Sequence, residues 1–422
     1  MSAPSLPGCR FCGAPLEHEM VDLGMSPLCQ TQIRAGELDR MEPFYPLRVL
    51  VCSRCFLAQI GEYVSPAEIF STDYPYFSSY SSSWLDHAAR YAERMIDELG
   101  LGPRHLVAEV ASNDGYLLKN FVRAGVPVLG IEPAASVAAA AREVGVRTEG
   151  RFLGAASARE LVEAYGAADL VLGNNVLAHV PDINDFVEGL RTLLKPGGRI
   201  TMEFPHLLRL MQNNQFDTIY HEHFSYLSWF AVRRVFAAHG LELFDVEELP
   251  THGGSLRIHA RHAGEDVAGP EPVPAGALSA RARALEDAER EWGVESLGTY
   301  ANFGERVRAI KQDLLGFLIE QKRAGRTVAG YGAPGKGNTL LNYCGIRTDF
   351  LDYTVDRNPH KRGTWTPGTR IPILDPSVIA ERRPDFVLVL PWNLRDELLE
   401  QLDYVRAWGG RLVFPIPALE VV

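Results

Sequence analysis

The chain lacks the features of a membrane, secreted or nucleic-acid-binding protein. Its 422 residues contain no apolar run of 18 residues, so we expect no membrane-spanning helix. The opening MSAPSLPGCR has neither the basic nor the apolar region of a secretory signal, which predicts a cytoplasmic protein. Lysine and arginine form no run, and the formal net charge of -11 argues against a nucleic-acid partner. The length and the 46% apolar content predict a globular protein of two or three domains.

Cysteine is also scarce, with six residues in the whole chain. In a cytoplasmic protein we do not expect them to form disulfides. Four of them form two C-x2-C pairs, which are Cys9, Cys12, Cys52 and Cys55. Two such pairs complete a tetrahedral thiolate site that suits zinc, and four thiolates leave no open position for water, so we expect a structural metal. Cys29 and Cys344 lack this pattern, which predicts ordinary buried thiols.

The most informative stretch is VAEVASNDGYLL at residues 107–118, followed by residues 128–132. It predicts a buried strand, a tight turn, a helix, and a second strand that ends in Glu132. The turn differs from G-x-G-x-x-G and offers carboxylate and amide side chains, which suits S-adenosylmethionine (SAM) better than a pyrophosphate. An acid at the tip of the second strand can accept both hydroxyls of a ribose. The alternative is a structural βαβ unit without a ligand.

Strand and helix patterns alternate beyond this unit. A helix is predicted from about residue 83, and strands at residues 169–174, 199–204, 241–246 and 255–260. LKPGG at residues 194–198 predicts a loop. Alternating units predict a parallel doubly wound sheet with its ligand at the carboxyl ends of the strands, where Asn174 and Asn175 lie. The predicted cofactor-binding residues are Glu109, Ala111, Asn113, Asp114, Gly115, Glu132, Pro133, Asn174 and Asn175.

The segment YHEHFSY, residues 220–226, contains two imidazoles, a carboxylate and two phenols. Burying so many polar groups without partners is costly. Three interpretations remain open. His221 and His223 could bind a metal, although no third ligand is obvious, or the segment could be an exposed loop without a role. We favour acid–base chemistry, because histidine titrates near neutral pH and Glu222 could polarise it.

A second polar aromatic cluster, TDYPYFSSY, occupies residues 72–80. It could be an aromatic linker that packs on the zinc domain. It could equally belong to the functional site. The residues alone favour neither interpretation.

The C-terminal part begins after a linker rich in glycine and proline at residues 264–276. A long charged helical region is predicted at residues 280–322. RTVAGY at residues 326–331 predicts a strand that leads into a glycine-rich turn and a helix, with further strands at residues 353–356 and 386–390. These patterns predict a second Rossmann-like α/β unit.

The glycine-rich turn GYGAPGKGNT has three interpretations. As a Walker loop it has Gly330, Gly335 and Lys336 in place, but Gly337 stands where a serine or threonine must bind magnesium. As a dinucleotide fingerprint, G-x-G-x-x-G is present and Asp356 follows at a suitable spacing for NAD. In the third interpretation, N–H groups at a helix start and Lys336 hold the diphosphate of a nucleotide-linked substrate. SAM in the first sheet favours this third interpretation.

Together these residues resemble the zinc-containing C-methyltransferases that act on nucleotide-linked keto-deoxysugars in antibiotic biosynthesis. The resemblance covers essentially the whole chain. It lies in the paired C-x2-C knuckles and in the strings YPYFSSYS, VASNDGYLL, NNVLAHVPD, YHEHFSYLS, GYGAPGKGNTLLNYCGI and VDRNPHKRGTWTPGT. Ala111 departs from the glycine that many methyltransferases carry at its position.

The resemblance implies an α/β protein with a small zinc-binding domain (1–70), a central Rossmann-like SAM-binding methyltransferase domain (71–262) and a second Rossmann-like domain that binds the nucleotide sugar (280–422). The two outer domains would clamp a TDP-sugar, and we expect a monomer. The implied catalytic residues are Tyr76 or its neighbour Tyr74, Tyr220, Glu222 and His223. The implied substrate-binding residues are Gly332, Ala333, Lys336, Gly337, Asn338 and Arg357.

The resemblance also implies a mechanism. A carbon beside a ketone is acidic only because its anion delocalises as an enolate. We expect His223 to remove this proton, Glu222 to orient His223, and a tyrosine hydroxyl or water to stabilise the enolate, whose carbon then attacks the methyl group of SAM. The substrate would be a TDP-4-keto-2,6-dideoxysugar methylated at C-3' or, alternatively, C-5'. The alternatives are O- or N-methylation of a nucleotide sugar, a NAD-dependent nucleotide-sugar oxidoreductase, and a binding module without catalysis.

Overall fold

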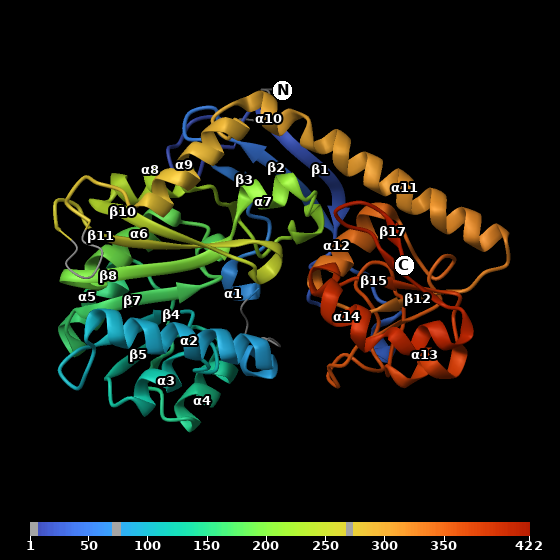
Figure 1. The fold of residues 1–422 in the computed structure, drawn as a ribbon, viewed down its shortest axis with the longest axis horizontal. Coiled ribbons are helices and arrows are strands. Elements are labelled where there is room, and N and C mark those ends of the chain that lie inside the picture. Colours follow the sequence, from blue (N-terminus) through green and yellow to red (C-terminus); the bar gives the residue numbers. More distant parts are fainter. Residues whose placement is uncertain (1–6, 70–76, 267–272) are drawn as a thin grey trace.

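The computed structural model describes residues 7–69, 77–266 and 273–422, which form three β-sheets and the helices that cover them (Figure 1). The N-terminal sheet is antiparallel, in the order β1-β2-β3-β9. Its strands are β1 (His18–Ser26), β2 (Tyr45–Val51), β3 (Ala58–Ile60) and β9 (Ser225–Tyr226). Because β9 is the end of YHEHFSY, that segment completes the sheet of the zinc region.

The central sheet has seven strands in the order β10-β11-β8-β7-β4-β5-β6. They are β4 (Val107–Val110), β5 (Val128–Ile131), β6 (Thr148–Glu149), β7 (Ala168–Asn174), β8 (Leu194–Pro205), β10 (Leu241–Leu249) and β11 (Ser255–His262). All the predicted strands of this region are present. The strands β6, β5, β4, β7 and β8 are parallel, so their carboxyl ends meet at one edge.

Two details of this sheet differ from the prediction. Strand β11 is antiparallel to both β8 and β10, so the sheet is not wholly parallel. A short loop joins β10 to β11, and so short a connection can join only antiparallel neighbours. Residues 194–198, predicted as a loop, instead begin β8, where the pairing with β7 shifts between Ala168 and Leu170 and Gly197 has a φ of 75°.

Helices cover both faces of the central sheet (Figure 1). They are α2 (Ser82–Leu99), α3 (Leu118–Arg123), α4 (Ala135–Glu143), α5 (Ala155–Tyr165), α6 (Ile183–Leu193) and α8 (Trp229–Ala238). Successive residues of a strand face opposite sides. Accordingly Val107, Leu170 and Leu172 pack with α2 and α3, whereas Ala108 and Val171 share a core with α5, α6 and α8.

The C-terminal part begins with three helices, and a six-stranded sheet with further helices of its own follows. The helices are α9 (Ala280–Trp292), α10 (Leu297–Ala301) and α11 (Phe303–Arg323), where one long helical region was predicted. Gly293, in the left-handed conformation at φ 85°, ends α9.

The sheet of the C-terminal part has the order β14-β13-β12-β15-β16-β17 and is parallel except for β17. Its elements are β12 (Val328–Tyr331), α12 (Gly335–Cys344), β13 (Thr354–Val355), β14 (Ile373–Leu374), α13 (Ser377–Arg382), β15 (Phe386–Val389), α14 (Arg395–Gln401), β16 (Arg411–Phe414) and β17 (Glu420–Val421).

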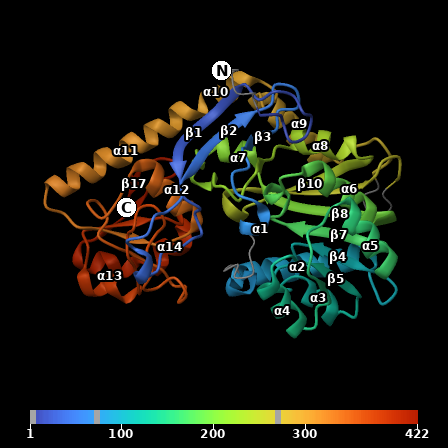
Figure 2. The ribbon, with the colours of Figure 1, turned by 180° about the vertical axis from the view of Figure 1, so that it is seen from behind.

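The N-terminal sheet and the C-terminal part share one apolar core. Met20 and Val21 of β1 pack in the same cluster as Phe303 and Val307 of α11 and Leu340 of α12. Seen from behind, β1 runs beside α11 and ends next to α12 (Figure 2). Short helices α1 (Pro66–Ile69) and α7 (Leu207–Gln212) complete the fold. Across the three described ranges, no helix is both long and apolar enough to cross a membrane.

Candidate active site and zinc site

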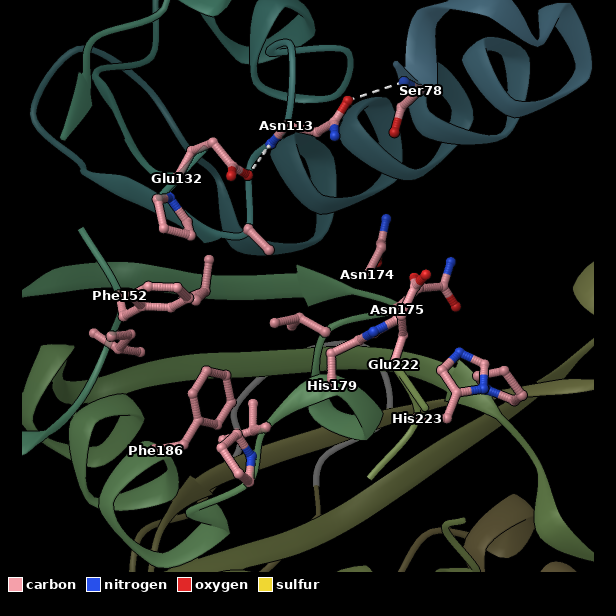
Figure 3. A pocket seen from close by; sticks show the side chains of 18 of the residues that line it. Ser78, Asn113, Glu132, Phe152, Asn174, Asn175, His179, Phe186, Glu222 and His223 are labelled. Carbon is pink, nitrogen blue, oxygen red and sulfur yellow. Dashed lines mark hydrogen bonds between the residues drawn. The ribbon is translucent and has the colours of Figure 1, made fainter. Parts of the chain in front are cut away.

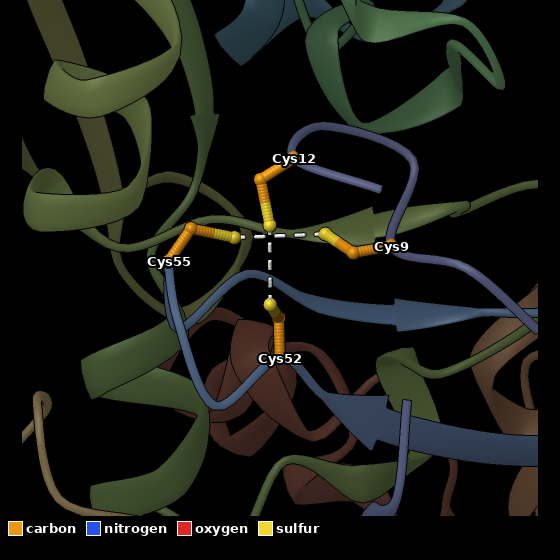
Figure 4. Close-up of side chains that lie close together, drawn as sticks. All are labelled: Cys9, Cys12, Cys52 and Cys55. Carbon is orange, nitrogen blue, oxygen red and sulfur yellow. Dashed lines mark hydrogen bonds between the residues drawn. The ribbon is translucent and has the colours of Figure 1, made fainter. Parts of the chain in front are cut away.

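The four paired cysteines converge in the structure as predicted (Figure 4). Their sulfur atoms all lie within 4.8 Å of one another, with Cys9 3.5 Å from Cys55 and Cys12 3.4 Å from Cys52. Zinc–sulfur bonds of about 2.3 Å in a tetrahedron place the sulfurs about 3.8 Å apart, so this set fits zinc. Gln59 Nε2 donates to Cys9 Sγ at 3.2 Å, which favours the thiolate form that binds a metal.

A cavity of about 650 Å³ lies at the carboxyl ends of the central strands. Ten of the predicted site residues line it, namely Ala111, Asn113, Glu132, Pro133, Asn174, Asn175, Tyr220, Glu222, His223 and Lys336. Figure 3 shows Glu132 and Asn113 at one end of this space and Glu222 and His223 at the other, with Asn174 and Asn175 between them. The structure therefore joins the predicted cofactor turn, the YHEH segment and the glycine-rich turn in one cavity.

The cofactor end is built from the turn after β4. The backbone of this turn is left-handed at Ala111 (φ 56°), Asn113 (φ 49°) and Gly115 (φ 75°). Glu132, at the end of β5, accepts hydrogen bonds from the backbone amides of Asn113 (3.0 Å) and Ala134 (2.9 Å). Each carboxylate oxygen keeps a lone pair, so Glu132 is held in place and can still accept ribose hydroxyls. Apolar side chains beside it, which suit an adenine ring, are Val110, Ile131, Phe152, Leu153 and Phe186.

Three predicted cofactor residues lie behind the cavity wall rather than on it. Glu109 is fully buried, and burial raises the pKa of its carboxyl well above the ordinary value. Gly115 packs against Ala141. Asp114 Oδ2 accepts from the amide of Ser79 at 3.0 Å. In the same way Asn113 Oδ1 accepts from the amide of Ser78 at 2.9 Å (Figure 3), so both side chains tether the segment that follows the YPY sequence. Tyr74 and Tyr76 themselves lie outside the described residues.

The backbone conformation of Ala111 accounts for the glycine that the resemblance implies at its position. A left-handed conformation costs alanine roughly 1–2 kcal/mol, and glycine avoids that cost. We expect Ala111→Gly to raise the free energy of unfolding by about 0.5–1 kcal/mol, because the greater freedom of unfolded glycine offsets part of the gain. Denaturant unfolding measures this. The control Ala89→Gly, inside α2, should lower stability by about 1 kcal/mol, and an equal loss in Ala111→Gly would contradict the explanation.

His223 is buried and its tautomer is fixed. Its Nδ1 lies 3.0 Å from the carbonyl oxygen of Thr218, which can only accept, so Nδ1 carries the proton and Nε2 keeps its lone pair. Burial and the neighbouring His179 lower the pKa of His223 well below its ordinary value. The ring centroid of Tyr220 lies 4.1 Å away and that of His179 4.7 Å away. At neutral pH His223 is therefore an uncharged imidazole with a basic nitrogen.

Glu222 has a different partner from the one expected. The predicted role was to orient His223, but the Thr218 carbonyl holds that ring. Glu222 instead receives a long contact from the Cys29 thiol, 3.9 Å from Sγ to Oε1. Burial raises the pKa of Glu222 to about 7. Cys29, predicted to be an ordinary thiol, thus lies against a cavity residue.

The metal interpretation of the two histidines is wrong. His221 does not line the cavity, and its Nε2 lies 3.3 Å from the carbonyl of Pro46. Within the described part of the chain, the four cysteines are the only group of three or more side chains placed to bind a metal. The exposed-loop interpretation is also wrong, because His221, Glu222 and His223 are all buried.

The glycine-rich turn contributes Pro334, Gly335 and Lys336 to the cavity wall. Lys336 Nζ donates to the side chain of Asn393 and lies 4.7 Å from the centroid of the Trp392 ring. Burial lowers the pKa of Lys336 to about 8, so it is largely cationic at neutral pH. The turn therefore brings a positive charge into the cavity that contains His223.

The other predicted substrate residues do not line the cavity. Gly332 and Gly337 allow close packing, since an added Cβ would lie 2.7 Å from Pro391 and 3.0 Å from Leu390 respectively. The amide of Ala333 donates to Asp356 at 2.8 Å, so the acid required by the NAD interpretation braces the turn. Asn338 Nδ2 donates to the carbonyl of Cys29 at 2.7 Å. Arg357 lies in a separate surface hollow with Arg362 and Gln401.

No sequence pattern singled out His179 and His252, yet both line the cavity. His179 follows Asn174 and Asn175 just beyond the end of β7, and that position was the available signal. His252 lies in the loop between β10 and β11, which the parallel-sheet prediction did not place near the site.

The structure combines a turn and an acid at the ends of parallel strands with a buried imidazole in the same cavity and a group of four cysteines. These are the features of a zinc-containing SAM-dependent methyltransferase. Family models match at residues 9–70 (zinc binding domain), 84–246 (methyltransferase domain) and 250–417 (C-methyltransferase C-terminal domain). C-methyltransferase NovU of Streptomyces niveus is 36% identical over 417 residues, which cover 98% of this chain and 96% of NovU. The chain belongs to this C-methyltransferase family.

Solved structures of methyltransferases match less than half of the chain. A SAM-dependent methyltransferase from Clostridium acetobutylicum covers 43% of this chain and 92% of its own, at 12% identity and a TM-score of 0.35. Magnesium protoporphyrin IX methyltransferase from Synechocystis, with bound SAM, covers 43% and 79%, at 15% identity and a TM-score of 0.32. The family assignment does not depend on them.

Proposed function

We propose that the protein transfers the methyl group of SAM to C-3' of a TDP-4-keto-2,6-dideoxysugar in deoxysugar and antibiotic biosynthesis. The observation that carries this proposal is the shared cavity, in which Glu132, His223 and Lys336 come from three different parts of the chain. Glu132 would hold the ribose of SAM, and Lys336 would attract the diphosphate of the sugar nucleotide. The C-methyltransferase name of the relative supports carbon as the acceptor.

The chemistry begins at His223. Its unprotonated Nε2 would remove the proton beside the ketone, and the electron pair would move to the carbonyl oxygen as an enolate. The negative charge of the enolate would offset the free-energy cost of burying the imidazolium that forms next to it. The hydroxyl of Tyr220 or Tyr76 would stabilise the enolate oxygen. The carbon then attacks the methyl group in line with the departing sulfur, a step that depends on the placement of two bound ligands.

The test is product analysis after incubation of the purified protein with SAM and a TDP-4-keto-2,6-dideoxyhexose. We expect the mass to rise by one methylene unit and NMR to place the new methyl on C-3'. A methyl on C-5' would change the proposed position of methylation but would leave the enolate mechanism unchanged. A methyl on oxygen or nitrogen would support the O- or N-methyltransferase alternative, and hydride transfer with NAD would support the oxidoreductase.

The pH dependence of kcat/KM separates two candidate bases, because this parameter reports the free enzyme. Burial lowers the pKa of His223, so the competent neutral ring is present throughout neutral pH and is lost only as the pH falls into the acid range. We therefore expect a flat profile through pH 7. Burial raises the pKa of Glu222 to about 7, so catalysis by its carboxylate would instead rise through about pH 7. Glu222→Gln should keep the flat profile, and a profile that rises in the native protein and flattens in this variant would identify Glu222 as the base.

A further inference from the structure

Arg10 lies inside the first C-x2-C pair, and its side chain extends out of the zinc knuckle. Its Nη1 donates to the carbonyl of Pro181 at 2.7 Å, and its Nη2 donates to the carbonyl of Ile60 at 2.6 Å. The guanidinium carbon lies 5.4 Å from the centroid of the Phe224 ring. One side chain therefore contacts three segments that are distant in the sequence.

Two of these contacts lie next to the cavity histidines. Pro181 follows His179 by two residues and lines the cavity itself, and Phe224 directly follows His223. The rings of His179 and His223 meet edge to face, with centroids 4.7 Å apart. The guanidinium of Arg10 thus contacts both of the chain segments whose histidines meet in the cavity.

The backbone of the knuckle is fixed to the same region. Asn184 Nδ2 donates to the carbonyls of Arg10 (3.1 Å) and Phe11 (3.0 Å). The amide of Arg10 donates to Gln59 Oε1 at 2.9 Å, and Gln59 Nε2 donates to Cys9 Sγ at 3.2 Å. Hydrogen bonds therefore link the metal ligand Cys9 to the His179 segment through Gln59 and Arg10, and the contact of Arg10 with the Phe224 ring adds the His223 segment.

We propose that Arg10 is a positioning residue that couples the zinc knuckle to the catalytic site by fixing His179 against His223. This inference rests on the proposed function of the cavity. The planar guanidinium matches two carbonyls at once, which a lysine or glutamine cannot reproduce. Proton abstraction and methyl transfer tolerate little displacement, and a shift of about 1 Å can cost about 100-fold in rate.

Arg54 provides a matched control, because it lies inside the second C-x2-C pair. Its side chain is exposed, and its backbone amide donates to Cys52 Sγ at 3.4 Å. Arg54→Gln therefore removes a positive charge from a knuckle without touching the cavity segments. Arg10→Lys is the conservative variant, which keeps the charge and can reach one carbonyl.

The experiment compares Arg10→Gln, Arg10→Lys and Arg54→Gln with the native chain. Zinc per chain, the Kd for SAM, and kcat and KM are measured for each. We expect Arg10→Gln to keep its zinc and its SAM affinity while kcat falls by about 10- to 100-fold. Arg10→Lys should recover part of this loss, and Arg54→Gln should behave as the native protein does.

A second readout does not depend on the sugar substrate. In nitrogen-15 spectra of the histidine rings, Arg10→Gln should shift the signals of His179 and His223, and Arg54→Gln should leave them unchanged. If the native protein fails to methylate the sugar, the proposed function fails and these spectra still test Arg10. The proposal is overturned if Arg10→Gln keeps native ring signals and native kcat. It is also overturned if zinc and kcat fall together in Arg10→Gln and Arg10→Lys, because Arg10 would then only maintain the metal site.

Discussion

Replacement of His223 by asparagine is expected to lower the rate of carbon methylation by about 10³-fold, the contribution typical of a well-placed general base. Asparagine can still donate to the Thr218 carbonyl, as His223 Nδ1 does at 3.0 Å, but it has no basic nitrogen at the position of Nε2. The affinity for SAM should stay close to native, because Glu132 and the turn after β4 are untouched. Single-turnover kinetics and calorimetric titration with SAM measure the two effects.

The matched control is His221→Asn, two residues away in the same segment. His221 is buried as His223 is, but its ring points to the Pro46 carbonyl and to Tyr45, away from the cavity. We expect this variant to lose stability and to keep its turnover per folded molecule. Near-native turnover in His223→Asn, or an equal loss in both variants, would remove His223 from the mechanism.

Loss of the zinc site is expected to have the largest effect on stability. Cys52→Ser leaves three thiolates, and a structural zinc in a small domain contributes on the order of 10 kcal/mol to folding. The N-terminal sheet should then unravel, and with it the pairing of β3 with β9 that holds the YHEH segment. We expect a lower unfolding temperature, loss of bound zinc and loss of methyl transfer together, measured by calorimetry, metal analysis and turnover.

Cys344→Ser is the control for this variant. Cys344 is a buried thiol of α12 that lies outside the metal group. Serine there should cost only about 1–3 kcal/mol for an imperfectly satisfied hydroxyl, with full zinc retained. A zinc-free Cys52→Ser protein as stable as Cys344→Ser would show that the metal is not structural.

Local sequence patterns predicted many elements of the fold, although not all of them. The strand, turn and helix at residues 107–118 and the two C-x2-C pairs depend on short-range chemistry, and the structure forms both. The pairing of the strands was harder to predict from the sequence. Strand β9 pairs with β3, although strands β4 to β8 of the central sheet lie between them in the sequence. Pairings of this kind depend on the tertiary fold and leave no periodic pattern in the sequence.

The site was predicted in part for the same reason. His223 and Lys336 come from distant segments of the chain. The family resemblance predicted that both belong to the site, and both line the cavity. Thr218 could not be predicted, because it orients His223 through a backbone carbonyl, which every residue possesses. The resemblance places Arg357 among the substrate-binding residues because it lies in the string VDRNPHKRGTWTPGT. In the structure, however, Arg357 lies in a surface hollow that is separate from the cavity.

The central claim is that this cavity forms an enolate, and hydrogen exchange at carbon tests it most directly. The protein is incubated in D₂O with a TDP-4-keto-2,6-dideoxyhexose and S-adenosylhomocysteine in place of SAM, so that methyl transfer cannot follow. Our account predicts deuterium at C-3' with the native protein and almost none with His223→Asn. An absence of exchange with the native protein, while SAM still yields a methylated sugar, would show that no solvent-exchangeable enolate forms at C-3' and would contradict the account.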